Sequence, residues 1–223
     1  MSIKNPIELV DYIDHSYLLR KKEITDFLIL VNKTETELKE TLEKSFVLLL
    51  YSHWEGYIKE VSNLYIRYIT SQKKTIQELT DNFYDIYLKE LLKSYQKNTN
   101  LEIESDLRKR ILKLEQKFNI DFTSDYYEKF ILGVESNLKF EKYLNICKLT
   151  NYEFNDEMGL FERVLFKVIH NRNSIAHTGS KATDNSYVSY EDLENMMYFL
   201  LEEMKKFKDH IISCIEDRKF LKN

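Results

Sequence analysis

The chain has 223 residues, and its 33 Lys and Arg against 37 Asp and Glu give a formal net charge of −4. This charge excludes a dedicated nonspecific nucleic-acid binder built on excess Lys and Arg, although it leaves room for a local basic site. Only 4 Gly and 1 Pro are present, so the chain lacks the breakers that many-stranded folds need at their turns. We therefore expect long helices and an all-α fold.

The first two predicted helices form one half of the expected core. Pro6 is well placed as the first residue of a helix over 6–31, because its missing N–H costs nothing there. Apolar residues then recur at helical period over 38–69 and predict the longest helix of the chain. Its segment 48–50 is apolar on every side and is expected to pass through the centre of the protein.

The sequence pattern in the middle of the chain predicts shorter helices that are separated by polar turns. They cover 75–97, 103–118 and 124–147. We interpret the region 75–150 as a helical insertion beside a core formed by 6–70 and 156–220, all within a single domain over 1–223.

The last part of the chain predicts two more helices of the core. The amphipathic stretch 156–177 ends just before Gly179, a residue suited to the left-handed conformation that stops a helix. Ser189, with Asp192 three residues later, is typical of a capping box at the start of a final helix. Nothing here predicts a membrane partner, since the longest apolar run, Phe46 to Tyr51, is too short to span a bilayer.

The cysteines and the N-terminus indicate a compartment. Cys147 and Cys214 lack metal-type spacing, and a disulfide framework would need more cysteines. The N-terminal residues begin an amphipathic stretch and do not resemble a signal peptide. We therefore expect a cytoplasmic protein.

The segment of the sequence with candidate functional residues is HNRNSIAHTG, from His170 to Gly179. At about 100° per residue, Arg172 falls within roughly 20° of Phe161, so its guanidinium is expected on the buried face of the helix. Because Arg stays charged at ordinary pH, it must face a carboxylate, a phosphate or an open cleft. The rest of this face is apolar: Val164, Leu165, Val168, Ile169, Ile175 and Ala176.

The opposite side of the same helix end is polar. His170, Asn173 and His177 lie within about 60° of one another on the helical wheel. Roughly 140° separates Arg172 from His177, so one helix cannot easily aim both side chains at one phosphate. Two copies related by a two-fold axis can do so, because each helix end then offers an Arg and a His to a shared cleft. We expect a homodimer with the Gly179 ends near the axis.

These residues carry a family resemblance. Arg172-Asn173-x-x-x-His177, near the C-terminal end of a helix in an all-helical domain, resembles the signature of HEPN superfamily ribonucleases. The segment Tyr51-Ser52-His53-Trp54-Glu55-Gly56 on the long helix is similar to a segment in one prokaryotic branch of that superfamily. The resemblance covers mainly 38–70 and 158–215 and implies a helical bundle of the HEPN type.

The resemblance implies a metal-independent endoribonuclease of the toxin-antitoxin or anti-phage defence type, acting as a homodimer on RNA. The 2′-hydroxyl of the RNA is then the nucleophile, and His177 is the acid or base, since an imidazole titrates near neutral pH. Arg172 holds the scissile phosphate and offsets the charge of the transition state. Asn173 orients the other groups of the site or hydrogen-bonds to them, and Glu55, His170 and His53 are candidates for supporting residues. No cofactor or metal is implied, whereas an antitoxin or sensor protein is an expected partner.

Structural roles stay open for each of these residues. Arg172 can form a salt bridge with Glu55, at the edge of the apolar stripe of the long helix, and we expect these two side chains to approach each other. The helix macrodipole alone favours His177 at a C-terminus. His170 and His53 fit packing or capping roles better than catalytic ones. The chain can also be a noncatalytic HEPN-type interaction or nucleotide-binding module that regulates a partner, or a purely structural helical domain.

Overall fold

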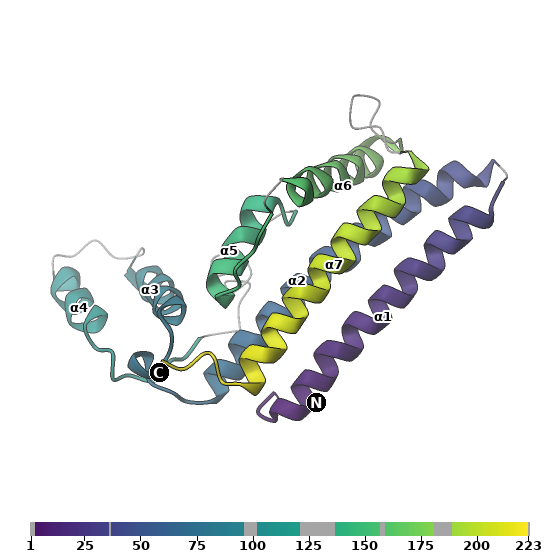
Figure 1. The fold of residues 1–223 in the computed structure, drawn as a ribbon. Coiled ribbons are helices and arrows are strands. Elements are labelled where there is room, and N and C mark those ends of the chain that lie inside the picture. The colour runs from purple at the N-terminus through teal and green to yellow at the C-terminus, as the bar shows by residue number, and fades with distance from the viewer. Residues whose placement is uncertain are drawn as a thin grey trace.

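The fold is a bundle of long helices with further helices on one side, as the composition predicted. The computed structural model describes residues 3–35, 37–95, 102–120, 137–156, 159–180 and 189–222. The long helices α1, α2 and α7 lie side by side, and both termini are at the same end of them (Figure 1). In chain order the helices are α1 (Pro6–Lys33), α2 (Leu38–Ser71), the 3-10 turn η1 (Ile76–Glu78), α3 (Asp81–Tyr95), α4 (Glu102–Ile111), α5 (Phe140–Thr150), α6 (Leu160–Thr178) and α7 (Tyr190–Glu216).

Several predicted helix bounds differ from those observed, mostly in the middle of the chain. The stretch 75–97 is divided into η1 and α3, and the helix predicted over 103–118 ends at Ile111. It ends there because the following residues hydrogen-bond another segment: the Phe118 N–H donates to the Lys74 carbonyl at 2.9 Å, and the Phe118 ring is buried against Phe83. Of the helix predicted over 124–147, residues 140–147 belong to α5, and the part before 137 lies outside the described residues.

The core is built around α2, the longest of the described helices, which packs against α1, α6 and α7. Trp54 of α2 is fully buried, and its ring lies 5.0 Å from that of Tyr143 in α5 and 5.4 Å from that of Phe161 in α6. This aromatic cluster fixes the start of α6 against the centre of the bundle. Within the apolar segment 48–50, only Leu50 is fully buried, whereas its two neighbours are half-buried.

The ends of α6 are set by local sequence signals. Both oxygens of Asp156 accept backbone N–H groups at its start, from Phe161 at 3.2 Å and from Glu162 at 3.0 Å. These bonds satisfy donors that would otherwise have no partner in the first turn. At the other end Gly179 adopts φ +71° and its N–H donates to the Ile175 carbonyl, which confirms the predicted stop. The predicted capping box at Ser189 is likewise present at the start of α7.

The described part of the chain contains no helix that is both long and apolar enough to cross a bilayer. Cys147 and Cys214 are both buried and free of disulfide bonds. Burial raises the pKa of the Cys147 thiol to about 12, so this sulfur is held in its protonated, unreactive form.

Candidate active site

The Arg-Asn-x-x-x-His motif occupies the last turns of α6, and the helix buries a slightly different face from the one predicted. Phe161, Leu165, Val168, Ile169 and Ile175 are buried as expected. Asn171 is fully buried instead of Ala176, which is exposed. The reason is that α6 packs against both α2 and α7. The side-chain amide of Asn171 donates to the Lys167 carbonyl at 2.9 Å, which gives one of its N–H groups a partner inside the bundle.

Arg172 lies at the edge of this buried face and is half-buried. Its Nη1 donates to Oδ1 of Asn173 at 3.0 Å, and the same oxygen accepts from Nδ2 of Asn137 at 2.8 Å. Asn137 lies just before α5, so this contact ties the motif to a second element. Because the amide oxygen of Asn173 accepts two hydrogen bonds, the side chain is held in one orientation, and this orientation fixes the direction of the guanidinium.

The aromatic ring of Tyr51 in α2 supports the guanidinium from the other side. The Arg172 Cζ lies 5.4 Å from the centroid of this ring, within the range of a cation–π contact. The hydroxyl of Tyr51 accepts the backbone N–H of Leu138 at 2.7 Å. Burial, followed by the nearby Glu55 carboxylate, raises the pKa of the Tyr51 hydroxyl well above its usual value. Tyr51 is therefore a neutral platform that joins α2, α6 and the start of α5.

Glu55 and Arg172, both described residues, form no direct ion pair, the alternative that the sequence left open. The carboxylate of Glu55 instead binds Nζ of Lys59, one turn along α2, at 3.1 Å. The Glu55 carboxylate also raises the pKa of the nearby Tyr51 hydroxyl. Glu55 and Arg172 therefore share Tyr51 as a neighbour, without an ion pair between them in the described structure. The physical reason is exposure: a half-buried guanidinium over an aromatic ring keeps contact with solvent and does not require a buried carboxylate.

His177 is exposed in the last turn of α6, two residues before the Gly179 cap. Arg172 precedes it by five residues, which corresponds to about 7.5 Å along a helix axis. The structure thus presents a positioned guanidinium and an accessible imidazole at the same helix end. Asn173, whose amide is already oriented by Asn137, lies between these two residues in the sequence.

His170 lies two residues before the motif and lines a cavity of about 370 Å³ beside it. Its ring stacks on that of Phe166 at 5.8 Å between centroids and 18° between planes. Phe166 is 62% exposed, which is unusual for a side chain of this size in a helix that otherwise buries its aromatic residues. The cavity adjoins the motif through Asn173 and is otherwise lined by Lys139, Phe140, Glu141, Glu162 and Ile169.

His53 is not part of this site, because it faces α1 on the other side of α2. Its Nδ1 lies 3.4 Å from Nη1 of Arg20, and its Nε2 lies 3.1 Å from Oε2 of Glu23. His53 Nε2 and Glu23 Oε2 are close enough for an ion pair, but the angles between them do not make a hydrogen bond. Burial and the Arg20 charge lower the pKa of His53. The residue therefore belongs to the packing of α1 against α2, the structural role that the sequence left open for it.

Sequence reasoning missed Tyr51, Asn137 and Phe166 as members of this region. The sequence indicates Tyr51 only as part of the segment 51–56 that is similar to one HEPN branch, and nothing in a linear pattern predicts that its ring supports Arg172. Asn137 is distant from the motif in sequence, so no periodicity joins them. Phe166 could have been found, because it falls outside the buried face of the wheel and precedes His170 by one turn.

Comparison with known protein families identifies the chain. A family model described as RiboL-PSP-HEPN matches residues 15–213, a range that includes α2 and the whole of α6. Neither a curated protein nor a solved structure matches the chain. Within the described residues, no group of three or more His, Cys, Asp and Glu is placed to hold a metal ion. The match spans most of the sequence, including the Arg172–His177 motif, and the chain therefore belongs to the RiboL-PSP-HEPN family.

Proposed function

We propose that the protein is a metal-independent endoribonuclease that cleaves RNA with Arg172, Asn173 and His177. A HEPN domain indicates a nuclease or a nucleotide-binding function, and the arrangement of the motif favours the first. The observation that carries the proposal is the pairing of a guanidinium fixed by Asn173 and Tyr51 with an exposed imidazole in the same helix end. These are the two groups that cleavage of a phosphodiester through its own 2′-hydroxyl requires.

The reaction needs one proton removed and one proton supplied. The 2′-oxygen attacks phosphorus as its proton leaves to a base, and the bond from phosphorus to the 5′-oxygen breaks as that oxygen gains a proton. The products are a 2′,3′-cyclic phosphate and a free 5′-hydroxyl. An imidazole performs either transfer near neutral pH. Arg172 binds the non-bridging oxygens, where charge grows in the transition state, and Asn173 keeps the guanidinium aligned.

The cavity beside the motif supports a nucleic-acid substrate. Phe166 exposes one face of a ring pair whose other member is His170, three residues from Asn173 in sequence. Bases of single-stranded RNA stack on exposed aromatic rings, and such stacking tolerates any base. We propose that a base next to the scissile phosphate stacks on Phe166. A single-stranded RNA is therefore the expected substrate class.

The purified protein is expected to cleave single-stranded RNA in EDTA. The chemistry above uses only side chains, so chelation of divalent metals is expected to leave the rate within about twofold of its value without EDTA. The measurement is electrophoresis of a labelled RNA after incubation with and without chelator. If the protein binds nucleotides but does not cleave RNA, the proposal is overturned and the noncatalytic module is favoured.

We further propose that the active form is a homodimer with the Gly179 ends of α6 near a two-fold axis. Two His177 side chains then serve one phosphate, one as base and the other as acid, which a single imidazole can do only in successive steps. Light scattering at working concentration is expected to give twice the mass of 27.0 kDa. A monomer that cleaves RNA at full rate would contradict this part of the proposal.

An unrestrained endoribonuclease degrades the RNA of its own cell, so such a protein needs a partner that controls it. We propose a role in a toxin-antitoxin or anti-phage defence system, with an antitoxin or sensor protein as that partner. Expression in bacteria is expected to arrest growth and fragment total RNA, and His177→Ala is expected to relieve both effects. Growth arrest that persists in the variant with intact RNA would refute this role.

A further inference from the structure

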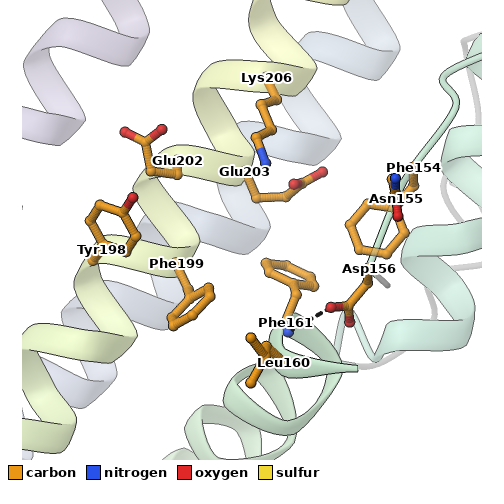
Figure 2. Close-up of a pocket in the computed structure, with 10 residues that line it drawn as sticks. All are labelled: Phe154, Asn155, Asp156, Leu160, Phe161, Tyr198, Phe199, Glu202, Glu203 and Lys206. Atoms are coloured by element: carbon orange, nitrogen blue, oxygen red, sulfur yellow. Dashed lines mark hydrogen bonds between the residues drawn. The ribbon is translucent and has the colours of Figure 1, made fainter. Parts of the chain in front are cut away.

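A second cavity, of about 440 Å³, lies at the opposite end of α6 from the motif. It opens where the connection between α5 and α6, the first turn of α6 and the middle of α7 meet (Figure 2). The residues that line it are Phe154, Asn155, Asp156, Leu160, Phe161, Tyr198, Phe199, Glu202, Glu203 and Lys206. Arg172, Asn173 and His177 are not among them, so this cavity has no part in the proposed cleavage.

Aromatic rings form much of its wall. Phe154 and Phe161 pack edge to face, with centroids 5.5 Å apart, and Phe199 faces them from α7. Tyr198 lies at the rim and is 61% exposed. Ring faces carry a negative quadrupole and attract cations, the more strongly where water is excluded.

A buried carboxylate stands beside these rings. Glu203 is only 4% exposed, and its side chain extends from α7 toward the connection that carries Phe154 and Asn155 (Figure 2). Its Oε1 accepts hydrogen bonds from the hydroxyls of Tyr143 at 2.5 Å and Tyr152 at 3.0 Å. Both bonds fall on the same oxygen, so Oε2 is not used by either tyrosine. The two hydroxyls hold the carboxylate rigidly, as a binding site requires.

The charges around the cavity are mainly negative. Asp156, Glu202 and Glu203 line it together with one basic residue, Lys206. Asp156 is engaged by the backbone N–H groups at the start of α6, and Lys206 is exposed, three residues along α7 from Glu203. Burial raises the pKa of Glu203 above its usual value, although the two tyrosine hydroxyls and the charge of Lys206 oppose this shift. A cation in the cavity would offset the cost of this buried charge.

We propose that this cavity binds a guanidinium group, either of a small metabolite or of an arginine side chain from a partner. A guanidinium is planar, so it stacks on the rings of Phe154, Phe161 or Phe199, and its edge donates to Oε2 of Glu203. The cavity favours a cation over a phosphate or carboxylate ligand, because Glu202 and Glu203 repel anions. The volume exceeds that of the guanidinium alone, so the cavity also accepts the alkyl chain that carries it.

Calorimetric titration with n-butylguanidinium and its neutral isostere n-butylurea tests the proposal on the wild-type protein. The guanidinium is expected to bind saturably at one site per chain, and the urea at least about tenfold more weakly, the factor that corresponds to one charge-assisted hydrogen bond. Equal affinity for the two compounds, or no saturable binding of the guanidinium, would overturn the proposal. The assay contains no RNA, so its result is independent of the proposed nuclease function.

Two variants locate the site. Glu203→Gln keeps an oxygen that accepts from Tyr143 and Tyr152 but removes the charge, and it is expected to abolish the preference for guanidinium over urea. Lys206→Met removes the repelling cation and is expected to increase the affinity for guanidinium a few-fold. A preference that survives Glu203→Gln unchanged, in protein with a wild-type melting curve, would place the ligand elsewhere and contradict the assignment. If Glu203→Gln does not fold, an affinity unchanged by Lys206→Met contradicts it in the same way.

A capped peptide, acetyl-Gly-Arg-Gly-amide, distinguishes the two sources of the ligand. Binding at least about tenfold tighter than that of n-butylguanidinium indicates an arginine of a partner protein, since the flanking peptide then adds contacts at the rim. Weaker binding than that of n-butylguanidinium indicates a free metabolite, since the peptide backbone then does not fit. Both results support the guanidinium site, and failure of both compounds to bind would reject it.

Discussion

His177→Ala is expected to lower the rate of RNA cleavage by about 10² to 10⁴, the usual cost of losing a positioned acid or base. The side chain is exposed in the last turn of α6 and packs into no core. The variant should therefore keep the wild-type melting temperature, dimer mass and helical circular dichroism. A timed cleavage assay with a labelled RNA, at equal protein concentration, gives the ratio of rates.

Arg172→Ala is expected to cause a loss of similar size, because the guanidinium offsets charge in the transition state. Arg172→Lys is the matched variant: it retains the positive charge and removes the planar fork that bonds Asn173 and lies over Tyr51. Lys at this position should recover only part of the rate. Cleavage at the wild-type rate in both alanine variants would mean that these residues do not carry the chemistry, and the interaction-module alternative would replace the nuclease.

Trp54→Ala is expected to lower the free energy of unfolding by about 3 to 5 kcal/mol. The indole is fully buried where α2, α5 and α6 meet, against the rings of Tyr143 and Phe161. Its removal leaves a cavity that backbone from three helices cannot easily fill. For a chain of this size the melting temperature should fall by about 10 °C, measured by thermal circular dichroism.

Tyr198→Ala is the matched control for Trp54→Ala, since it also removes a large aromatic side chain. Tyr198 is 61% exposed, so its loss should change the free energy of unfolding by less than about 0.5 kcal/mol. Equal effects of the two substitutions would mean that Trp54 does not anchor the bundle.

The fold could be predicted largely from the sequence because its signals are local. Scarce Gly and Pro, helical periodicity, the Gly179 stop and the Ser189 capping box each act within a few residues. The prediction failed over 112–118, where backbone groups bond a segment about forty residues earlier in the chain. Helical periodicity cannot report such a long-range partner, since it records only which face of a segment is apolar.

The candidate site could be predicted only in part, for the same reason. Arg172, Asn173 and His177 lie within two turns of one helix, so their order along the chain fixes their relative placement. The groups that hold Arg172 come from elsewhere: Tyr51 from α2, and Asn137, through Asn173, from the residue segment before α5. The prediction of a carboxylate partner assumed full burial of the guanidinium. At the edge of the buried face, an aromatic ring meets the same need at lower desolvation cost.

The most direct test of the proposed nuclease uses a DNA oligonucleotide that carries a single ribonucleotide, incubated with the wild-type protein in EDTA. Attack by the 2′-hydroxyl predicts one cut, on the 3′ side of the ribonucleotide, and mass spectrometry should show a 2′,3′-cyclic phosphate on one product and a 5′-hydroxyl on the other. The all-DNA control should remain intact. Cleavage of the all-DNA strand, or a product with a 5′-phosphate, would contradict the assignment of Arg172 and His177 to this chemistry.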